Sequence, residues 1–455
     1  MIVLKFGGTS VKDAEAFERV LDIVTNTLSS SYICGNDVTK LIVLSASSGI
    51  TDKLIALVNA AKNADESTAM QIYASIEKRQ IEIMEGIFST NSPVYSACSA
   101  KVTALLLDLK HFVEGIIFFR EATPKALDKA VSYGERLSTT IFNFLLIYRG
   151  FDSVWLDARN LMKTDSTYIA AKVDLELSRV KVNEIYKDGL ISGKYFAVTQ
   201  GFIGSDFNGN TTTLGRGGSD YSAAIFGNLF EAEEIQIWTD VNGVLTADPR
   251  IVENTITISE MGFDEVRALA YFGAKVLHPQ TLIPAVESSI PVLVLNSLDK
   301  SHSGTKIIGT IQSGDVKLHS VVKINAVQIR INLAKVNNVT EKSIEILQIF
   351  RKNEIKIFST RILPDSLIIW FENNEDFENS ISNFLDTDFE LDTSKTLIGI
   401  VGNNMDKLQV SEIDTIYKDF TAVSINESKN SILIAVPIGE SNNALLQINN
   451  SIIRY

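Results

Sequence analysis

Two patterns of apolar residues divide the chain near residue 296. Before that point, short continuous apolar runs alternate with stretches in which apolar residues recur every three or four positions. Continuous runs are typical of strands in a parallel sheet covered by helices on both faces, and the longer spacing is typical of helices. The first part of the chain is therefore predicted to be α/β with a mainly parallel sheet. Its predicted strands carry the sequences LIVLSAS, VWLD, YFAVTQGFIG, IQIWTD and VLVLN.

The pattern changes after a polar segment, Asn296 to Leu318, that is rich in Ser, Gly, Lys and Asp and indicates a boundary. Beyond it, apolar and polar residues alternate strictly from Val327 to Leu333, as in a half-buried strand. The elements that follow predict the order β-α-β-β-α-β, a ferredoxin-like unit. A second round begins at TLIGIVG, includes a helix from about Ile413 to Phe420, and stops without a clear sixth element. We expect two such α+β units, with exchange of one strand between them left open.

Composition excludes several classes of protein. The net charge of −13 argues against general binding to nucleic acid or to an anionic membrane. Cys34 and Cys98 lie in no CxxC or Cys/His spacing, and the histidines do not cluster, which argues against a zinc site and a Ser-His-Asp relay. We find neither a signal-peptide pattern nor an apolar run long enough for a membrane helix, and expect a cytoplasmic protein.

The stretch KFGGTS follows the first predicted strand and precedes a helical pattern. A glycine turn that leads into a helix offers free backbone N–H groups and the positive end of the helix dipole, which together bind anions. Lys5 adds a full positive charge. A tight turn with an exposed lysine is equally consistent with this stretch alone. Ser10 precedes Asp13 by three residues, so a helix N-cap explains it at least as well as a ligand contact.

Two further polar stretches stand out. SASSGIT, Ser45 to Thr51, follows a predicted strand, where ligands bind in open α/β sheets. A turn with a helix cap explains it equally well. SYGERLST places Glu135 among apolar residues of a helical pattern that runs from Pro124 to Arg149. A carboxylate in such surroundings needs a partner. The alternative is an exposed salt bridge to Arg136 or another cation.

The stretch TTTLGRGGSDYSAA is the most informative. It approaches a dinucleotide-binding fingerprint, but Asp220 occupies the position of the third glycine and would repel a pyrophosphate. A phosphate-binding loop of the GKS or GKT type is absent, because Tyr195 follows Gly193-Lys194. So many glycines carry a large entropic cost, which argues against a purely structural loop.

A fifth stretch, IWTDVNGVLTADPR, ends a strand at Thr239-Asp240 and brings Arg250 nearby, and FGAKVLHP adds Lys275. An exposed polar turn is the alternative for the fifth stretch. Because most of these stretches follow strands, a parallel sheet would gather them along one edge. Lysine and arginine beside carboxylates suit phosphoryl transfer, which needs neutralisation of charge and little covalent chemistry from the protein.

In this order, KFGGTSV, VLSASSGIT, YGERLS, QGFIG, TTTLGRGGSDYSAA, WTDVNG, TADPR and FGAKVLHP resemble the aspartokinases of the amino-acid kinase superfamily. The resemblance covers Met1 to about Ser297. It implies a three-layer α-β-α amino-acid kinase fold, and the tail resembles the paired ACT domains of these enzymes. The expected divisions are a catalytic domain at 1–297, a linker at 298–320, and ACT-like units at 321–394 and 395–455.

The resemblance implies ATP-dependent phosphorylation of the side-chain carboxylate of L-aspartate to 4-phospho-L-aspartate, the first step towards lysine, threonine and methionine. Lys5 and Asp220 would be catalytic, and Mg²⁺ would arrive with ATP without direct protein ligands. The residues implied for L-aspartate are Ser45, Thr51, Glu135, Arg216, Gly217 and Ser219. Those implied for ATP are Lys5, Gly7, Gly8, Thr9, Ser10, Thr239, Asp240, Leu245, Arg250 and Lys275. The substrate carboxylate is already ionised at neutral pH, so no general base is needed.

Two positions depart from the family pattern. Leu245 replaces a tyrosine common among relatives, and the loop Asn337 to Thr340 lacks the glycine that often lets the backbone approach an effector. The missing glycine argues against lysine inhibition through that loop. An amino-acid effector at the ACT units and a homodimer or homotetramer are expected from the family. The alternatives are a kinase for another acceptor, such as glutamate, and a catalytically silent amino-acid sensor.

Overall fold

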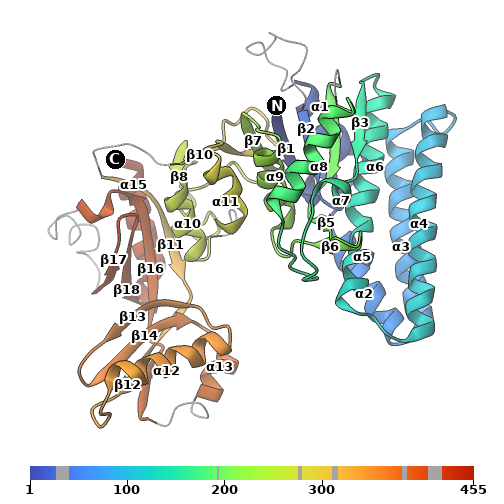
Figure 1. The fold of residues 1–455 in the computed structure, drawn as a ribbon. Coiled ribbons are helices and arrows are strands. Elements are labelled where there is room, and N and C mark those ends of the chain that lie inside the picture. The colour runs from blue at the N-terminus through green and yellow to red at the C-terminus, as the bar shows by residue number, and fades with distance from the viewer. Residues whose placement is uncertain are drawn as a thin grey trace. The chain divides into compact units, whose positions relative to one another are not determined.

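The computed structural model divides the chain into two compact units (Figure 1). Unit 1 comprises Met1–Val244 and Leu277–Gly309, and unit 2 comprises Leu245–Val276 and Thr310–Tyr455. This division differs from the expected boundary at residue 297 over the segment Leu245–Val276. The structure describes residues 1–26, 40–191, 194–274, 279–309, 316–381, 387–407 and 423–454.

Unit 1 is built on a mainly parallel sheet with the strand order β3-β4-β2-β1-β7-β9-β10. All neighbours are parallel except β10, which runs antiparallel to β9. The five strands predicted from continuous apolar runs are confirmed as β2, β3, β4, β7 and β9. The bounds are β1 Ile2–Phe6, β2 Lys40–Leu44, β3 Ser153–Leu156, β4 Phe196–Gln200, β7 Glu234–Thr239, β9 Val292–Asn296 and β10 Thr305–Ile308.

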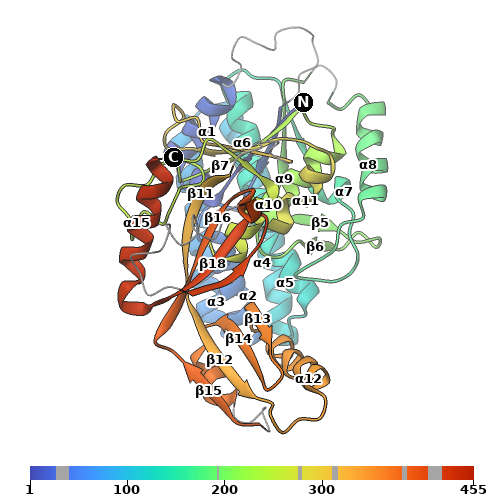
Figure 2. The same ribbon diagram turned by 90° about the vertical axis from the view of Figure 1, so that its left-hand side faces the viewer.

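Helices cover both faces of this sheet (Figures 1 and 2). On one face lie α1 Ala14–Asn26, α2 Ile50–Lys62, α3 Glu66–Ile87, α4 Pro93–Phe119 and α6 Tyr133–Tyr148, which share one apolar core with β1 and β2. On the other face, α9 Gly218–Leu229 packs on β1 and β7, and α8 Leu175–Lys187 and α11 Pro279–Glu287 pack on α9. The three-layer α-β-α fold is therefore confirmed.

Strand alternation decides which layer each side chain of β1 meets. Leu4 and Phe6 belong to the core under α1 and α6. Lys5, between them, must point to the opposite face, where α9 lies. The smaller elements of unit 1 are the 3₁₀ helix η1 Gly8–Val11, the helices α5 Pro124–Val131 and α7 Ala158–Leu161, and the antiparallel pair β5 Ile203–Ser205 and β6 Thr211–Thr213.

Two helix predictions need correction. The helical pattern from Pro124 to Arg149 forms two helices, because α5 ends at Val131 and α6 begins after Ser132. The Ser10 hydroxyl does not cap α1. It donates a hydrogen bond to the Ser297 hydroxyl, and Asp13 accepts one from the backbone N–H of Ala16. The spacing of Ser10 and Asp13 suggested the cap, but the Ser10 hydroxyl bonds instead to a residue far away in the sequence.

Unit 2 contains two four-stranded antiparallel sheets, ordered β13-β14-β12-β15 and β11-β16-β18-β17. The first sheet and α12 enclose a core in which Phe350, Phe371 and Phe377 contact one another. Its elements are β12 Ala326–Asn332, α12 Val339–Lys352, β13 Ile357–Ile362, β14 Ser366–Glu372, α13 Glu375–Ser380 and β15 Phe389–Asp392.

The second sheet takes its edge strand from before the first sheet in sequence. β11 precedes β12, yet it pairs antiparallel with β16, and so supplies the element that the second round of the pattern lacked. The predicted helix from Ile413 to Phe420 lies outside the described residues. The remaining elements are β8 Glu260–Gly262, α10 Phe263–Tyr271, β11 Lys317–Ile324, β16 Lys395–Asn403, η3 Met405–Lys407, β17 Val423–Glu427, β18 Ser431–Pro437, η4 Ile438–Glu440 and α15 Ser441–Arg454.

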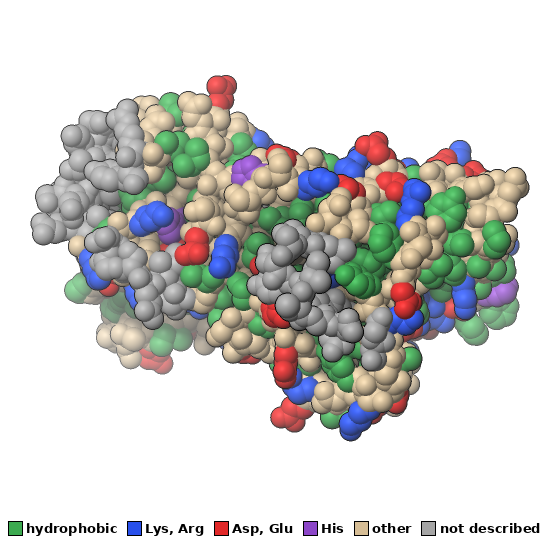
Figure 3. Space-filling view, turned by 90° about the horizontal axis from the view of Figure 1, so that it is seen from above, with side chains coloured by type: hydrophobic (Ala, Val, Ile, Leu, Met, Phe, Trp, Pro, Cys, Tyr) green, Lys and Arg blue, Asp and Glu red, His purple; other side chains and the backbone are tan. Residues whose placement is uncertain are grey.

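The surface carries both signs of charge. On the face drawn in Figure 3, the coloured Lys and Arg side chains are interspersed with Asp and Glu. The excess of acidic residues is therefore not gathered into one patch on that part of the described surface. Among the described residues, no helix combines the length and apolar character that crossing a bilayer requires.

The contact between α9 and β7 predicts the effect of one added methyl group. A Cβ on Gly227 would lie 2.4 Å from Cδ1 and 2.8 Å from Cγ1 of Ile235, which is fully buried. We expect Gly227→Ala to lower the free energy of unfolding by about 1–3 kcal/mol, despite the helix propensity of alanine. Denaturant unfolding measures this.

Gly115→Ala in α4 is the matched control, because no atom lies within 4 Å of its added Cβ. It should stabilise the protein by roughly 0.5–1 kcal/mol through helix propensity. Equal effects of the two substitutions would contradict the close packing of α9 on β7.

Candidate active site

A cavity of about 390 Å³ opens beside the carboxyl ends of β1 and β2, where ligands bind in open α/β sheets. The loops that follow both strands line it, together with α6 and the N-terminal turn of α9. Its lining residues are Lys5, Gly7, Gly8, Ser45, Ala46, Ser47, Ser48, Gly49, Thr51, Asp52, Glu135, Phe202, Gly215, Gly217, Gly218, Ser219 and Asp220.

Lys5 and Asp220 form an ion pair at the cavity wall. The Lys5 Nζ lies 2.5 Å from Asp220 Oδ1, and the two side chains are 10% and 20% exposed. Lys5 comes from β1 and Asp220 from the first turn of α9, where the helix dipole favours a carboxylate. The pair therefore holds an ammonium group in place at the edge of the sheet, with Asp220 as its counter-charge.

The loop after β1 runs against the loop after β2, so glycine is required there. A Cβ on Gly8 would lie 2.8 Å from the carbonyl oxygen of Ala46, closer than real Cβ contacts come. The Gly8 carbonyl accepts a hydrogen bond from the backbone N–H of Ser48. This close approach of two backbones brings the stretches KFGGTS and SASSGIT into one wall of the cavity.

Glu135 is a buried carboxylate that lines the cavity. Its side chain is 3% exposed, and one oxygen accepts a hydrogen bond of 3.1 Å from the backbone N–H of Ala46. The other oxygen, and the nearby hydroxyl of Ser47, have no hydrogen-bond partner among the described residues. The expected alternative, an exposed salt bridge to Arg136, is wrong. A buried carboxylate with an unused oxygen suits a cationic ligand.

Burial raises the pKa of Glu135 to about 8, from an ordinary value of 4.5. The hydrogen bond from Ala46 opposes this shift but does not cancel it. A ligand cation beside Glu135 would lower its pKa, because an opposite charge favours the ionised form.

Phe202 lines the cavity but was missed in the sequence analysis, although it lies within the quoted stretch QGFIG. Its backbone φ is +69°, unusual for a residue other than glycine. The Phe202 N–H donates a hydrogen bond of 2.8 Å to the Ser222 hydroxyl, and the Phe202 carbonyl accepts one from the backbone N–H of Leu214. These bonds join the backbone of Phe202 to Leu214 and to α9, the helix that carries Ser219 and Asp220.

The cavity gathers only part of the predicted site. It brings together Lys5, Gly7, Gly8, Ser45, Thr51, Glu135, Gly217, Ser219 and Asp220. Arg216 lies between two lining glycines, but its side chain is exposed. Thr9, Ser10, Thr239 and Asp240 belong to unit 1 without lining the cavity, Leu245 and Arg250 belong to unit 2, and Lys275 lies outside the described residues.

Ser10 and Thr239 are nevertheless linked. The Ser10 hydroxyl donates to the Ser297 hydroxyl over 3.0 Å, and the Ser297 hydroxyl donates to the Thr239 carbonyl over 2.9 Å. The loop after β1 is thereby joined to the end of β7.

Arg250, in contrast, forms an exposed ion pair with Asp248 two residues before it. The described residues contain no group of three or more His, Cys, Asp or Glu side chains arranged to hold a metal ion.

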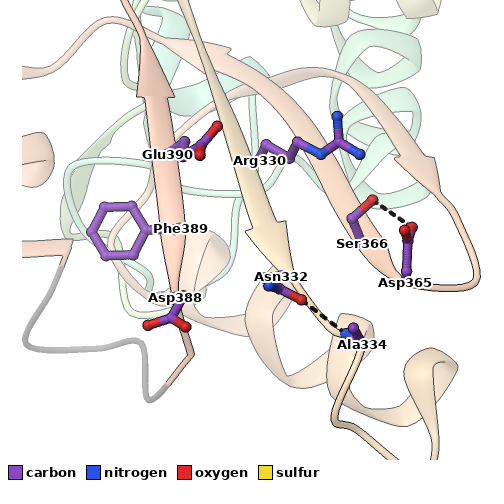
Figure 4. Close-up of a pocket in the computed structure, with 8 residues that line it drawn as sticks. All are labelled: Arg330, Asn332, Ala334, Asp365, Ser366, Asp388, Phe389 and Glu390. Carbon is purple, nitrogen blue, oxygen red and sulfur yellow. Dashed lines mark hydrogen bonds between the residues drawn. The ribbon is translucent and has the colours of Figure 1, made fainter.

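Unit 2 has a cavity of its own, of about 480 Å³ (Figure 4). Three carboxylates and one guanidinium line it, with Arg330 of β12 directly opposite Glu390 of the paired strand β15. The Ser366 hydroxyl donates a hydrogen bond to Asp365, and Asn332 accepts one from the backbone N–H of Ala334. The lining residues are Arg330, Asn332, Ala334, Asp365, Ser366, Asp388, Phe389 and Glu390.

Comparison with known proteins agrees with this geometry. The sequence profile of the amino acid kinase family matches residues 1–296, so the chain belongs to the amino acid kinase family. It is 38% identical over 316 residues to lysine-sensitive aspartokinase 3 of Escherichia coli, an alignment that covers 68% of this chain and 64% of that relative. The chain thus matches just under two thirds of the length of that curated relative.

Solved structures extend the likeness to the whole fold. E. coli aspartokinase III in complex with lysine and aspartate superposes with a TM-score of 0.82 at 28% identity, covering 99% of both chains. The same enzyme in complex with aspartate and ADP gives a TM-score of 0.77 at 28% identity, over 100% of both chains.

The raised pKa of Glu135 predicts a pH dependence of stability. The neutral carboxyl is compatible with burial, so its stabilising effect is complete below about pH 4.5 and is lost as the pH rises through about 8. We therefore compare the free energy of unfolding of the wild-type protein with that of Glu135→Gln. The wild-type value minus the variant value should fall by roughly 1 kcal/mol for each pH unit between pH 4.5 and 8.

Urea titrations of both proteins between pH 4.5 and 8 give the difference, in which all other groups cancel. A difference independent of pH would show that Glu135 is ionised and stabilised in the folded protein, contrary to its burial.

Proposed function

We propose that this chain transfers the terminal phosphate of ATP to the side-chain carboxylate of L-aspartate and forms 4-phospho-L-aspartate. That product is the first intermediate on the route to lysine, threonine and methionine. One observation carries the proposal: within an amino acid kinase fold, a single cavity holds the Lys5–Asp220 ion pair and the buried carboxylate of Glu135, of which one oxygen has no hydrogen-bond partner among the described residues. The names of the related E. coli enzyme and its complexes with aspartate and ADP support this choice of substrates.

L-Aspartate would bind through its α-amino and α-carboxylate groups. Glu135 accepts the α-ammonium, which supplies the missing charge partner of the buried carboxylate. Ser45, Thr51 and Ser219 surround the remaining polar atoms of the substrate. Arg216, which is exposed between Gly215 and Gly217, would pair with the α-carboxylate once its side chain turns inward.

ATP would place its terminal phosphate beside Lys5. The backbone of Gly7 and Gly8 lets the phosphate approach closely, and the Lys5 ammonium neutralises the charge that develops as the phosphoryl group moves. Mg²⁺ would arrive with the nucleotide, without direct protein ligands, and would supply further neutralisation of phosphate charge. Asp220 keeps the Lys5 ammonium at the cavity wall. Thr9, Ser10, Thr239, Asp240, Leu245, Arg250 and Lys275 are assigned to the nucleotide by family resemblance alone.

The chain's own residues need not act as a general base. The attacking carboxylate of aspartate is ionised at neutral pH, so catalysis reduces to alignment of the two substrates and neutralisation of charge. Closely related acceptors differ in length or in their α-amino group. Glutamate shares the ammonium, and therefore remains the second candidate. Acetylated acceptors lack the ammonium that Glu135 requires.

A catalytically silent amino-acid sensor is the remaining alternative. It would have no use for a buried ion pair beside the cavity in unit 1, whereas a kinase requires the Lys5 ammonium there. An assay that couples ADP formation to each acceptor separates the three functions. Aspartate should be turned over and N-acetylaspartate should not. Turnover of glutamate but not aspartate would overturn the proposed acceptor, and no turnover of any acceptor would favour the sensor.

Lys5→Ala tests the proposed catalytic role. Loss of the ammonium leaves the developing phosphate charge unbalanced, so turnover with aspartate should fall by at least about 10²–10³-fold. Lys12→Ala, an exposed lysine of the same loop region, should keep wild-type turnover. Thermal unfolding of both variants confirms that they are folded. Unchanged turnover of Lys5→Ala would refute the role.

We further propose that the cavity of unit 2 binds an amino-acid effector and that the protein forms a homodimer or homotetramer. Three carboxylates beside one guanidinium favour an amino acid with a second positive charge, such as lysine, over threonine or methionine. This cavity does not involve the glycine-free loop Asn337 to Thr340. The lysine sensitivity in the name of the related E. coli enzyme supports the same choice.

Asp388→Asn tests the effector proposal. Lysine should raise the melting temperature of the wild-type protein by a few degrees. Asp388→Asn loses one charge partner of the ligand, so it should need at least about tenfold more lysine for the same rise in melting temperature. Glu372→Gln is the control and should respond as wild type, because Glu372 lies at the end of β14 opposite to Ser366 and does not line the cavity. A shift with threonine or methionine alone would contradict the charge argument.

A further inference from the structure

Asp128 is a buried carboxylate that lies outside the lining of the cavity in unit 1. It sits in α5, 1% exposed, and accepts hydrogen bonds from two other segments. From Thr213 it accepts the backbone N–H at 2.9 Å and the hydroxyl at 2.7 Å. From Ile169 it accepts the backbone N–H at 3.0 Å. One side chain therefore joins α5, the end of β6 and the loop near residue 169.

The first of these segments leads directly into the cavity. Thr213 ends β6, and the chain continues through Leu214 into Gly215, Arg216 and Gly217. Both glycines have positive φ values, +76° and +72°, and both line the cavity. Two glycines so close together give the backbone of this loop many alternative conformations. The chain is held immediately before this loop, by the Asp128–Thr213 contact and by the hydrogen bond from the Leu214 N–H to the Phe202 carbonyl.

The second segment packs against the same loop. Ile169 has a φ of +75°, an unfavourable conformation for a β-branched residue. Its carbonyl oxygen lies 3.1 Å from the position that a Cβ on Gly215 would take. Ala171 donates a backbone hydrogen bond of 2.9 Å to the Thr213 carbonyl. The hydrogen bond from Ile169 to Asp128 thus holds a strained turn against Gly215.

A second carboxylate fixes the outer end of the Ile169 loop. Asp206, 1% exposed, accepts hydrogen bonds from the hydroxyls of Ser166 and Tyr168, each at 3.1 Å. The loop is therefore held from two sides, and of these two carboxylates it is Asp128 that also bonds to Thr213, where the chain enters the cavity. Burial raises the pKa of Asp128, and the hydrogen bonds from Ile169 and Thr213 oppose this shift by stabilising the ionised carboxylate. α5 lies beside β6 in both views of the fold (Figures 1 and 2).

We propose that Asp128 is a positioning residue that, through Thr213 and Ile169, holds the Gly215–Gly217 loop in the shape needed to bind the acceptor amino acid. This inference rests on the proposed function. Loss of the contact leaves the loop free to sample other conformations, and Arg216 and Ser219 then meet the acceptor less often. The cost falls on acceptor binding more than on ATP binding, because Lys5, Gly7 and Gly8 belong to the other wall.

The mildest test is Thr213→Val, which removes only the hydroxyl bond to Asp128 and keeps the shape of the side chain. Its KM for aspartate should rise about tenfold, with KM for ATP changed less than about twofold. Thr213→Ser keeps the hydroxyl and should restore the wild-type KM. In Asp128→Asn, the amide NH₂ group faces backbone N–H groups and cannot accept their hydrogen bonds. This variant should therefore raise the KM for aspartate further.

Asp65→Ala is the control for stability alone. It removes the cap of α3, where Asp65 accepts a hydrogen bond from the backbone N–H of Thr68, far in sequence from the loop. It should lower the melting temperature without changing either KM. If Asp65→Ala raises the KM for aspartate as much as Thr213→Val, Asp128 has a structural role only and the proposal fails.

Hydrogen–deuterium exchange separates this proposal from the proposed function. In Asp128→Asn, backbone amides of residues 165–172 and 213–220 should exchange at least about tenfold faster than in wild type, with α3 and α4 unchanged. This readout needs no substrate. A wild-type protein inactive on aspartate, with this local change in exchange, would refute the function and keep the loop contact. An active wild type whose variants change neither exchange nor KM would refute the positioning role.

Discussion

The Lys5–Asp220 ion pair is the contact on which the site depends. An ammonium group at the end of a buried strand is unstable without a counter-charge, and Asp220 supplies it from the first turn of α9. The pair therefore requires the end of β1 and the beginning of α9 to lie at the same edge of the sheet. Because Leu4 and Phe6 pack into the opposite layer, the alternation of β1 leaves Lys5 no other direction.

The two carboxylates that line the cavity on α9 and α6 have different surroundings. Asp220 is partly exposed and paired with a cation, whereas Glu135 is buried, has a raised pKa and forms no ion pair with the described residues. This difference supports the different roles that we propose for them, with Asp220 holding Lys5 and Glu135 receiving the ammonium group of the acceptor. The same cavity can then receive a phosphate at one wall and an amino acid at the other, which is the requirement of an amino acid kinase.

The sequence predicted those features that local patterns determine. Continuous apolar runs identified the strands of unit 1, and the polar stretches after them identified most of the cavity. Contacts between residues far apart in the chain could not be predicted from the sequence. The hydroxyl of Ser10 bonds to Ser297, the positive φ of Phe202 has no signature in composition, and β11 pairs with β16 across an entire intervening sheet. Glu135 was recognised as a candidate, but its burial and its bond to Ala46 required the fold.

A crystal structure with L-aspartate and a non-hydrolysable ATP analogue tests the central claim most directly. We predict the terminal phosphate within contact distance of Lys5 and the α-ammonium of aspartate beside Glu135, in the cavity of unit 1 that both residues line. Aspartate bound away from Glu135, or a phosphate that Lys5 does not reach, would contradict the account.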